Sequence, residues 1–483
     1  MIVIFFNTVY IIHHKKLEKR EIEMKRYVLF VCLFLSGLAG VYAQSIAPFQ
    51  KGDRIAFVGN SITCGGHYHS YIWLYYMTRF PDQRIDIFNE GVGGDVAEMI
   101  YQRLDKVFEH EPTVVTLSFG MNDVGYMDFR KPGADTIARN RVEKACRDYA
   151  FIEEVYKKYP EVRKILIGSS PYDETSRFNK VAFPGKNTPI LEIVDFLNAR
   201  ARENQWGFVD FNRPMVAINQ WEQAEDSMYT LCGKDRIHPS TDGHLVMAYL
   251  FLKAQGLAGK PVADIRIDGA GKKVTRSDNC RVSDLSVSSD NLTFTYEAKS
   301  LPYPIDTSYY DNEKHTQADA LSVIPFMDEM NYEGLSVSGL DGYYGLTIGG
   351  EFIGRFTARE LERGINMTLL QNTPQYKQAM KIRQMNEERW LKERKMREFY
   401  WVEYNLMRKT GMLWACNEAA VDTLRKYRPH DIFLQWNGDL WLQYMHKGIR
   451  EDCVNEQQDL VNQIYEQNKP IPLRIEIKKF TDL

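Results

Sequence analysis

Short apolar runs alternate with amphipathic segments of helix length between residues 54 and 256 of the chain. The apolar runs are residues 55–58, 85–88, 114–117, 165–167 and 208–211. They are nearly continuous in apolar side chains, which is typical of parallel strands covered on both faces. Apolar residues at every third or fourth position predict helices over 71–79, 96–109, 139–159 and 190–204. A loop is expected after the last run, followed by a helix over about 241–255. The alternation predicts an α/β unit built on a five-stranded parallel sheet.

The pattern changes at residues 256–261, where Gly and Pro end the helical periodicity. Strands are predicted beyond this point at 263–267, 292–296 and 344–356, the last as a hairpin. Gly349 and Gly350 fit a two-residue hairpin turn that requires positive φ. The final stretch, 473–480, alternates apolar and charged residues. It predicts a strand that returns to this β unit.

Helices are predicted between the hairpin and the final strand. Thr357 and Glu360 form a capping-box pattern for a short helix. Thr373, followed by Pro, opens a much longer helix that runs to about residue 409, and Gly411 is expected to end it. These helices form an insertion within the β unit.

Three parts follow from these patterns. They are a leader over 1–43, an α/β domain over 44–258 and a C-terminal region over 259–483. In the C-terminal region, β-rich segments over 259–356 and 470–483 flank the helical insertion over 357–469. The sequence shows no internal repeat.

The leader has the layout of a signal peptide. A basic start at Met24-Lys25-Arg26 precedes an apolar run over 27–38, and small residues suit cleavage before Gln44. Residues 1–23 then represent an upstream extension. We expect export to the periplasm or the extracellular space, with no membrane span after cleavage; an uncleaved anchor is the alternative.

Composition narrows the class of protein. Hydrophobic residues make up 44% and charged residues 26% of the 483 residues, which is ordinary globular usage and argues against a disordered or multi-span protein. The formal net charge of −3 gives no indication of a nucleic-acid partner.

Six cysteines remain after the leader, and export places them in an oxidising compartment. They are Cys64, Cys146, Cys232, Cys280, Cys416 and Cys453. Because none has the close spacing of a zinc site, we expect no structural metal. Two interpretations of Cys64 and Cys232 stay open, a disulfide bridge between them or a pair of free thiols.

The candidate chemistry begins directly after the first strand, at Gly59-Asn60-Ser61-Ile62-Thr63. Parallel sheets bind ligands at the carboxyl ends of their strands. A serine on this sharp turn is exposed, and nearby helix-start amides can stabilise negative charge on a substrate. The alternative interpretation is a serine that only caps a helix.

Two further motifs follow the second and third strands. In Asn89-Glu90-Gly91-Val92-Gly93-Gly94-Asp95, Gly94 can present its backbone N–H to a reacting oxygen without side-chain obstruction. A phosphate cradle is the alternative, but the Lys-Ser/Thr ending of a P-loop is missing. In Gly120-Met121-Asn122-Asp123, the carboxamide of Asn122 can donate to the same oxygen or can form an Asx turn.

The last motif is Asp235-Arg236-Ile237-His238-Pro239, past the fifth strand. The spacing lets the carboxylate of Asp235 reach the imidazole of His238 and hold the tautomer that accepts a proton. A lone histidine is more often structural. The joint occurrence of all four motifs at successive strand ends favours catalysis.

These four blocks resemble the SGNH hydrolases, also called GDSL esterases, over about residues 53–255. The resemblance implies a flavodoxin-like three-layer α/β/α sandwich without metal or cofactor. It also implies that Ser61 is the nucleophile and first oxyanion donor, that Gly94 and Asn122 are the other donors, and that His238 is the base oriented by Asp235. Asn60 stands where the family name has Asp, a change expected to alter local hydrogen bonding rather than chemistry.

The reaction expected from these residues is acyl transfer through a serine ester. Export and the appended β-rich unit make the chain similar to bacterial esterases that remove acetyl groups from cell-wall glycans, so an acylated carbohydrate is the expected substrate. A lipid or thioester hydrolase with the same residues and a noncatalytic glycan-binding protein are the alternatives.

Overall fold

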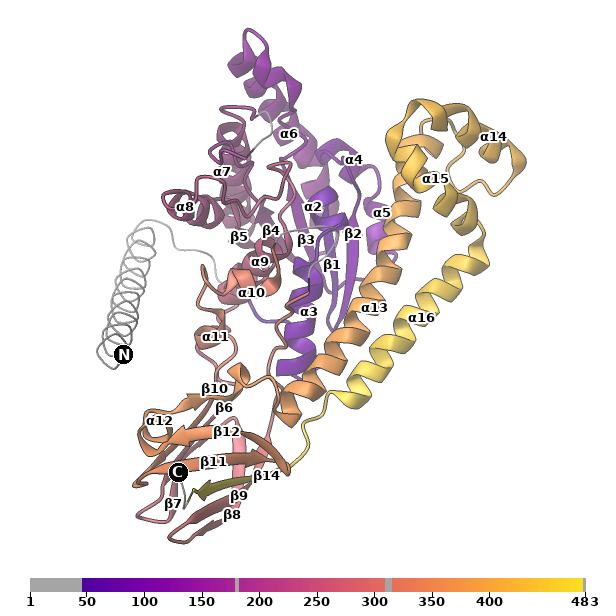
Figure 1. Cartoon of the computed structure of the whole chain (residues 1–483). Helices are drawn as coiled ribbons and strands as arrows, with labels where there is room; N and C mark the ends of the chain where they lie inside the picture. The colour runs from indigo at the N-terminus through magenta and orange to yellow at the C-terminus, as the bar shows by residue number, and fades with distance from the viewer. Residues whose placement is uncertain (1–45, 179–181, 309–314, 481–483) are drawn as a thin grey trace, which may run out of the picture. The chain divides into compact units, whose positions relative to one another are not determined.

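The computed structural model describes residues 46–178, 182–308 and 315–480 (Figure 1). The expected leader, with the signal peptide over 24–43 and the extension over 1–23, lies outside these residues. Within the described part of the chain, no helix combines the length and the apolar character needed to cross a membrane.

The N-terminal part of the described chain is built on a five-stranded sheet in the order β2-β1-β3-β4-β5. The strands are β1 (Arg54–Gly59), β2 (Asp86–Gly91), β3 (Val114–Phe119), β4 (Arg163–Gly168) and β5 (Gly207–Asp210). Every pairing is parallel, and Ile55 of β1 aligns with Ile87 on one side and Val114 on the other. This is the flavodoxin-like strand order, and the predicted fold class is confirmed.

Helices cover both faces of this sheet. They are α2 (Ser61–Cys64), α3 (Tyr68–Arg79), α4 (Ala97–Tyr101), α5 (Leu104–Phe108), α6 (Ala134–Lys157), α7 (Asn187–Asn204), α8 (Asn212–Gln223) and α9 (Thr241–Ala254), with a 3₁₀ turn η2 (Met127–Arg130). α3 packs beside α9, whereas α6 packs beside α4 and α7. Most residues of the strands between them are buried, and the apolar ones, such as Ile55, Val115 and Leu166, have almost no exposed surface, which explains the hydrophobic runs.

Two expectations for this part were wrong. The segment predicted as one helix over 96–109 is broken into α4 and α5, because the backbone of Arg103 leaves the helical region (φ −130°, ψ 11°). The loop expected after the last strand contains the 12-residue helix α8. Its buried face includes Asn212 and Asn219, so its apolar stripe is too short to be read from the sequence.

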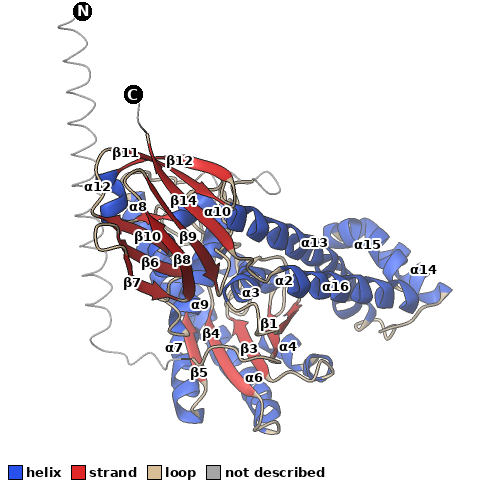
Figure 2. Cartoon of the chain, turned by 90° about the horizontal axis from the view of Figure 1, so that it is seen from below, coloured by secondary structure: helices blue, strands red, loops and turns tan. Residues whose placement is uncertain are grey.

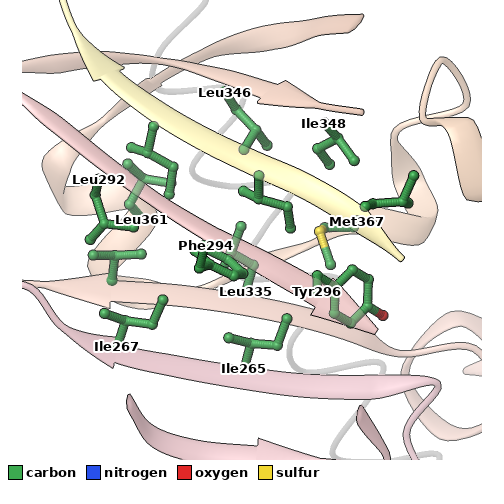
Figure 3. Close-up of a cluster of buried hydrophobic side chains, with 14 of the residues drawn as sticks. Ile265, Ile267, Leu292, Phe294, Tyr296, Leu335, Leu346, Ile348, Leu361 and Met367 are labelled. Atoms are coloured by element: carbon green, nitrogen blue, oxygen red, sulfur yellow. The ribbon is translucent and has the colours of Figure 1, made fainter. Parts of the chain in front are cut away.

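The C-terminal region contains two further sheets, in the orders β13-β10-β6-β7 and β12-β11-β14-β9-β8. Their strands are β6 (Ala263–Asp268), β7 (Lys273–Asp278), β8 (Cys280–Val287), β9 (Asn291–Ala298), β10 (Glu333–Ser338), β11 (Tyr343–Ile348), β12 (Glu351–Thr357), β13 (Ile365–Asn366) and β14 (Leu473–Lys479). Buried side chains from both sheets, among them Ile265, Phe294, Leu335 and Leu346, form one core (Figure 3). The hairpin glycines Gly349 and Gly350 have φ of 57° and 85°, as the turn requires.

The final strand β14 does return to the β unit. It lies between β9 and β11 and is antiparallel to both, with Ile475 aligned with Phe294 and Ile348. The intervening helices are therefore an insertion in the chain path, as predicted. Short helical elements also precede them: α10 (Gln317–Ala320), α11 (Phe326–Glu329), α12 (Ala358–Arg363) and η3 (Met367–Leu369).

The helical insertion consists of α13 (Pro374–Val402), the π-helical turn η4 (Glu403–Met407), α14 (Glu418–Tyr427), η5 (Arg428–His430), α15 (Ile432–Tyr444) and α16 (Lys447–Gln467). α13 and α16 lie side by side along much of their length (Figures 1 and 2). Thr373 is the N-cap of α13, as predicted, and Gly411 has a φ of 72°. α13 also passes α3 and the edge strand β2, which brings the insertion against the α/β part.

Candidate active site

Ser61 is the first residue of α2, directly after β1. Asn60 caps this helix by accepting a hydrogen bond from the Ile62 N–H at 3.0 Å. Asn60, which stands in place of the Asp of the family name, thus keeps the helix cap, because an amide oxygen accepts this bond as a carboxylate would. Asn89 of β2 donates to the Cys64 carbonyl at 2.9 Å and ties α2 to the neighbouring strand.

The structure brings Ser61, His238 and Asp235 into one hydrogen-bonded chain. Nε2 of His238 lies 2.7 Å from Oγ of Ser61, and Nδ1 lies 2.5 Å from Oδ2 of Asp235. The other carboxylate oxygen accepts the backbone N–H groups of Ile237 and His238, both at 2.9 Å. Burial acts to raise the pKa of Asp235, but the hydrogen bonds from His238 outweigh it and lower that pKa. Asp235 therefore stays ionised and can hold a proton on Nδ1 of His238.

Arg236, which sequence reasoning did not single out, anchors the loop that carries these residues. Its backbone has a φ of 69°, and its side chain is buried. The guanidinium donates to the carbonyls of Asp173 at 3.1 Å and Phe178 at 2.7 Å. A buried arginine between Asp235 and His238 explains how a surface loop holds both side chains in one geometry.

Gly94 and Asn122 follow the strands on either side of β1, so the sheet order places them at the same edge as Ser61. Gly94 has a φ of 83°, a conformation that L side chains adopt only at a cost, and a Cβ there would meet no atom within 4 Å. No described residue accepts a hydrogen bond from the N–H of Gly94. That donor and the space beside it are open.

The carboxamide of Asn122 is fixed from both ends. Its Nδ2 donates to the Asp95 carbonyl at 3.0 Å, and its Oδ1 accepts the hydroxyl of Tyr126 at 2.5 Å. Because an amide nitrogen carries two hydrogens, one N–H of Asn122 remains for a substrate. Burial, with the nearby charges of Asp235 and Asp123, raises the pKa of Tyr126, so its hydroxyl stays protonated and donates. Tyr126 was missed, although its position four residues after Asn122 in a polar loop was a signal.

Lys186 holds the loop that carries Asn122 through hydrogen bonds to its backbone. Its buried Nζ donates to the carbonyls of Met121 at 2.8 Å and Gly125 at 2.5 Å, and it lies 3.8 Å from the ring centre of Tyr126. Burial and the nearby charge of Arg141 lower the pKa of Lys186 to about 7. Nothing in its sequence surroundings marked this lysine.

A buried charge network lies behind the glycine loop. Arg103 bonds the carboxylate of Asp95 at 2.7 Å and the carbonyl of Gly59 at 3.1 Å. It also lies 3.7 Å from Glu90, whose carboxylate is 3.2 Å from Arg397 on α13. The network links the nucleophile turn, the glycine loop and the helical insertion. Its signal in the sequence was a basic residue on the otherwise apolar face of the 96–109 segment.

The described residues hold no metal-type cluster of His, Cys, Asp and Glu. Cys64 and Cys232 are both free thiols, so of the two interpretations left open the structure has the unbridged one. Burial raises the pKa of the Cys64 thiol to about 11, and the Cys232 thiol donates to the Pro171 carbonyl at 3.2 Å. Both sulfurs act as packed, protonated groups in this structure.

Comparison with known proteins agrees with the geometry. Residues 57–246 match the model of the GDSL-like lipase/acylhydrolase family. The solved structure of a gut microbial diltiazem-metabolizing enzyme is 42% identical, with a TM-score of 0.89, over 91% of this chain and 100% of that one. The chain belongs to the GDSL-like lipase/acylhydrolase family. It is a carboxylic ester hydrolase with an α/β domain and C-terminal helical and β-rich parts.

Two further likenesses cover parts of this GDSL-like hydrolase. An acetylxylan esterase of Geobacillus stearothermophilus is 23% identical over 226 residues, which are 43% of this chain and 95% of that protein. Residues 380–469 match a model described as the diltiazem deacetylase C-terminal helical domain. The first likeness covers less than half of this chain, and the second falls within the helical insertion.

Proposed function

We propose that this hydrolase removes acetyl groups from acetylated carbohydrates through a covalent acetyl-enzyme on Ser61. The observation that carries the proposal is the continuous chain from Oγ of Ser61 through His238 to Asp235, at 2.7 and 2.5 Å. Such a chain is what a serine hydroxyl needs to become a nucleophile near neutral pH.

In the proposed reaction, Oγ of Ser61 attacks the ester carbonyl carbon while Nε2 of His238 takes the hydroxyl proton. The tetrahedral intermediate collapses, His238 gives that proton to the leaving alcohol oxygen, and the acetyl group stays on Ser61. A water molecule then loses a proton to His238 and attacks the acetyl carbon, and as the C–Oγ bond breaks His238 gives that proton to Oγ of Ser61, which releases acetate and restores the serine hydroxyl. Asp235 stabilises the charged imidazole in both halves.

The negative charge on the carbonyl oxygen needs donors that already point at it. The N–H of Gly94 and the second Nδ2 hydrogen of Asn122 are uncommitted, and the N–H of Ser61 starts a helix. We assign these donors to the oxyanion, because preorganised N–H groups stabilise charge without reorganisation.

The carbohydrate part of the proposal is supported by the acetylxylan esterase likeness and by the export expected from the leader. A second substrate class, acetylated drugs of the diltiazem type, is favoured by the 42% identity to a diltiazem-metabolizing enzyme and by the helical-domain match. A lipid or thioester hydrolase is separated from both by comparing acetyl with octanoyl esters.

Ser61→Ala tests the mechanism. We expect the variant to keep the wild-type melting temperature and to lose turnover of p-nitrophenyl acetate and release of acetate from acetylated xylan. Turnover at the wild-type rate by the folded variant would remove Ser61 from the mechanism. Octanoyl esters cleaved faster than acetyl esters by the wild type would instead refute the deacetylase assignment.

A further inference from the structure

The helical insertion places an indole ring against the glycine loop. Trp401, near the end of α13, lies so close to Gly93 that a Cβ there would be 3.1 Å from its Cδ1 and 3.3 Å from its Nε1. The next residue, Gly94, faces open space. Trp401 therefore borders the region beside the proposed oxyanion donor without filling it.

The N–H of this indole is uncommitted. Three buried tryptophans in the described chain donate to protein acceptors: Trp73 to Ile85, Trp390 to Gly66 and Trp441 to Glu403. The half-buried Trp401 has no such acceptor among the described residues. Because an indole N–H usually finds a partner when it leaves water, this donor is available to a substrate oxygen.

Two more rings continue outward from Trp401 on α15. The ring of Phe433 lies 5.4 Å from that of Trp401 and is tilted by 38°, and the ring of Trp436 lies 5.4 Å from Phe433 at 85°. Phe433 and Trp436 are 49% and 66% exposed. Contiguous large apolar side chains exposed on a protein surface mark a binding site more often than an ordinary solvent-facing surface.

The row is open rather than enclosed. A cavity of about 530 Å³ beside α13 is lined by the rings of Tyr400, Tyr404 and Trp414, and none of the three rings of the row lines it. A compact aryl ligand needs a pocket that covers most of its surface. A sugar chain instead stacks the C–H face of each ring on an aromatic side chain and keeps its hydroxyl edge in water. The exposed row of rings therefore suits a sugar chain better than a compact aryl ligand.

We propose that Trp401, Phe433 and Trp436 form a stacking surface, the ring row, that binds the sugar units next to the acetylated one. Trp401 donates to an oxygen of the sugar unit nearest the reacting ester, and Trp436 contacts a sugar unit farther along the oligosaccharide. The proposal rests on the carbohydrate deacetylase function given above and adds that the preferred substrate is an oligosaccharide rather than an acetylated monosaccharide.

The test measures selectivity within one enzyme. For the wild type and for Trp401→Ala, Phe433→Ala and Trp436→Ala, kcat/KM is measured on acetylated xylo-oligosaccharides of two to six units and is divided by kcat/KM on p-nitrophenyl acetate. Phe352→Ala is the matched control, because Phe352 is a 56% exposed aromatic residue on β12, outside the ring row.

We expect the wild-type ratio to rise with chain length, and the Trp401 and Trp436 variants to lower it by about 3- to 10-fold on the longest substrate, mainly through KM. Phe352→Ala is expected to keep the wild-type ratio. An unchanged ratio in both tryptophan variants would overturn the ring row, whether or not gel filtration then shows that the rings join two copies of the chain.

If the proposed carbohydrate deacetylase function is wrong, the result differs from the one that would overturn the ring row. A wild type that hydrolyses diltiazem but no sugar acetate would refute the carbohydrate assignment before any variant is compared. Loss of diltiazem turnover in the Trp401 variant would then assign the ring row to aryl ligands and overturn the sugar version.

Discussion

Replacing Tyr126 by Phe removes one oxygen atom from the region of the proposed oxyanion site and changes nothing else in shape. In the structure that hydroxyl donates to Oδ1 of Asn122 at 2.5 Å and keeps the amide from rotating about its side-chain bonds. The remaining bond, from Nδ2 of Asn122 to the Asp95 carbonyl, holds only one end of the group.

The size of the effect follows from what is lost. A hydrogen bond of this kind contributes about 0.5–1.5 kcal/mol net, which corresponds to a decrease in kcat of roughly 2- to 13-fold if the whole loss appears in the barrier. Removing the donor itself with Asn122→Ala costs more, about 2.7–4 kcal/mol. Tyr126→Phe should therefore fall between the wild type and Asn122→Ala.

Steady-state hydrolysis of p-nitrophenyl acetate by all three proteins provides the measurement, with thermal unfolding as a check on the fold. We expect kcat to fall and KM to stay within about twofold, because the oxyanion forms only after binding. Adding Tyr126→Phe to Asn122→Ala should cost nothing further. A double variant slower than Asn122→Ala by the full single-variant factor would show that Tyr126 does not act through Asn122.

Gly94→Ala places a side chain at a φ of 83° in open space, so it should lower stability by about 1–2 kcal/mol in urea unfolding and reduce kcat by turning the backbone N–H; a wild-type kcat would remove Gly94 from the oxyanion site. Burial acts to raise the pKa of Glu90, but the stronger effects of Arg397, His110 and Arg103 lower that pKa to about 2. Since the folded pKa lies below the ordinary glutamate value of 4.5, the ionised carboxylate stabilises the fold above pH 4.5, and this stability is lost as the pH falls toward 2. The difference in unfolding free energy between the wild type and Glu90→Gln should shrink by about 3 kcal/mol from about pH 6 to about pH 2, and a constant difference would argue against the ion pairs.

The α/β fold could be predicted because its strands are buried on both faces and so appear as continuous apolar runs such as residues 55–58. The residues that meet around Ser61 could also be proposed, since parallel strands bring their carboxyl ends to one edge. What brings them to bonding distance was not predictable. Arg236 and Tyr126 act through carbonyl and amide groups whose positions depend on the folded loops.

The contacts between the helical insertion and the α/β part were also beyond the sequence. Glu90 and Arg397 are more than 300 positions apart, and each alone has the pattern of a solvated charge. Helix α8 was missed for a related reason, because Asn219 is buried to accept the Leu231 N–H at 2.8 Å and not to pack apolar surface. The positions of buried polar residues depend on their hydrogen-bond partners and not on a helical period of apolar residues.

The place of β14 in the middle of its sheet sets the order in which this protein can be completed during synthesis. Strands β9 and β11 are made well over 100 residues before the strand that joins them, and the whole helical insertion emerges in between. Until Leu473–Lys479 leaves the ribosome, both neighbours carry an unpaired edge of the kind that promotes aggregation. A ribosome-stalled chain that stops before residue 470 should therefore expose this half-sheet to protease, although the α/β part upstream is already complete.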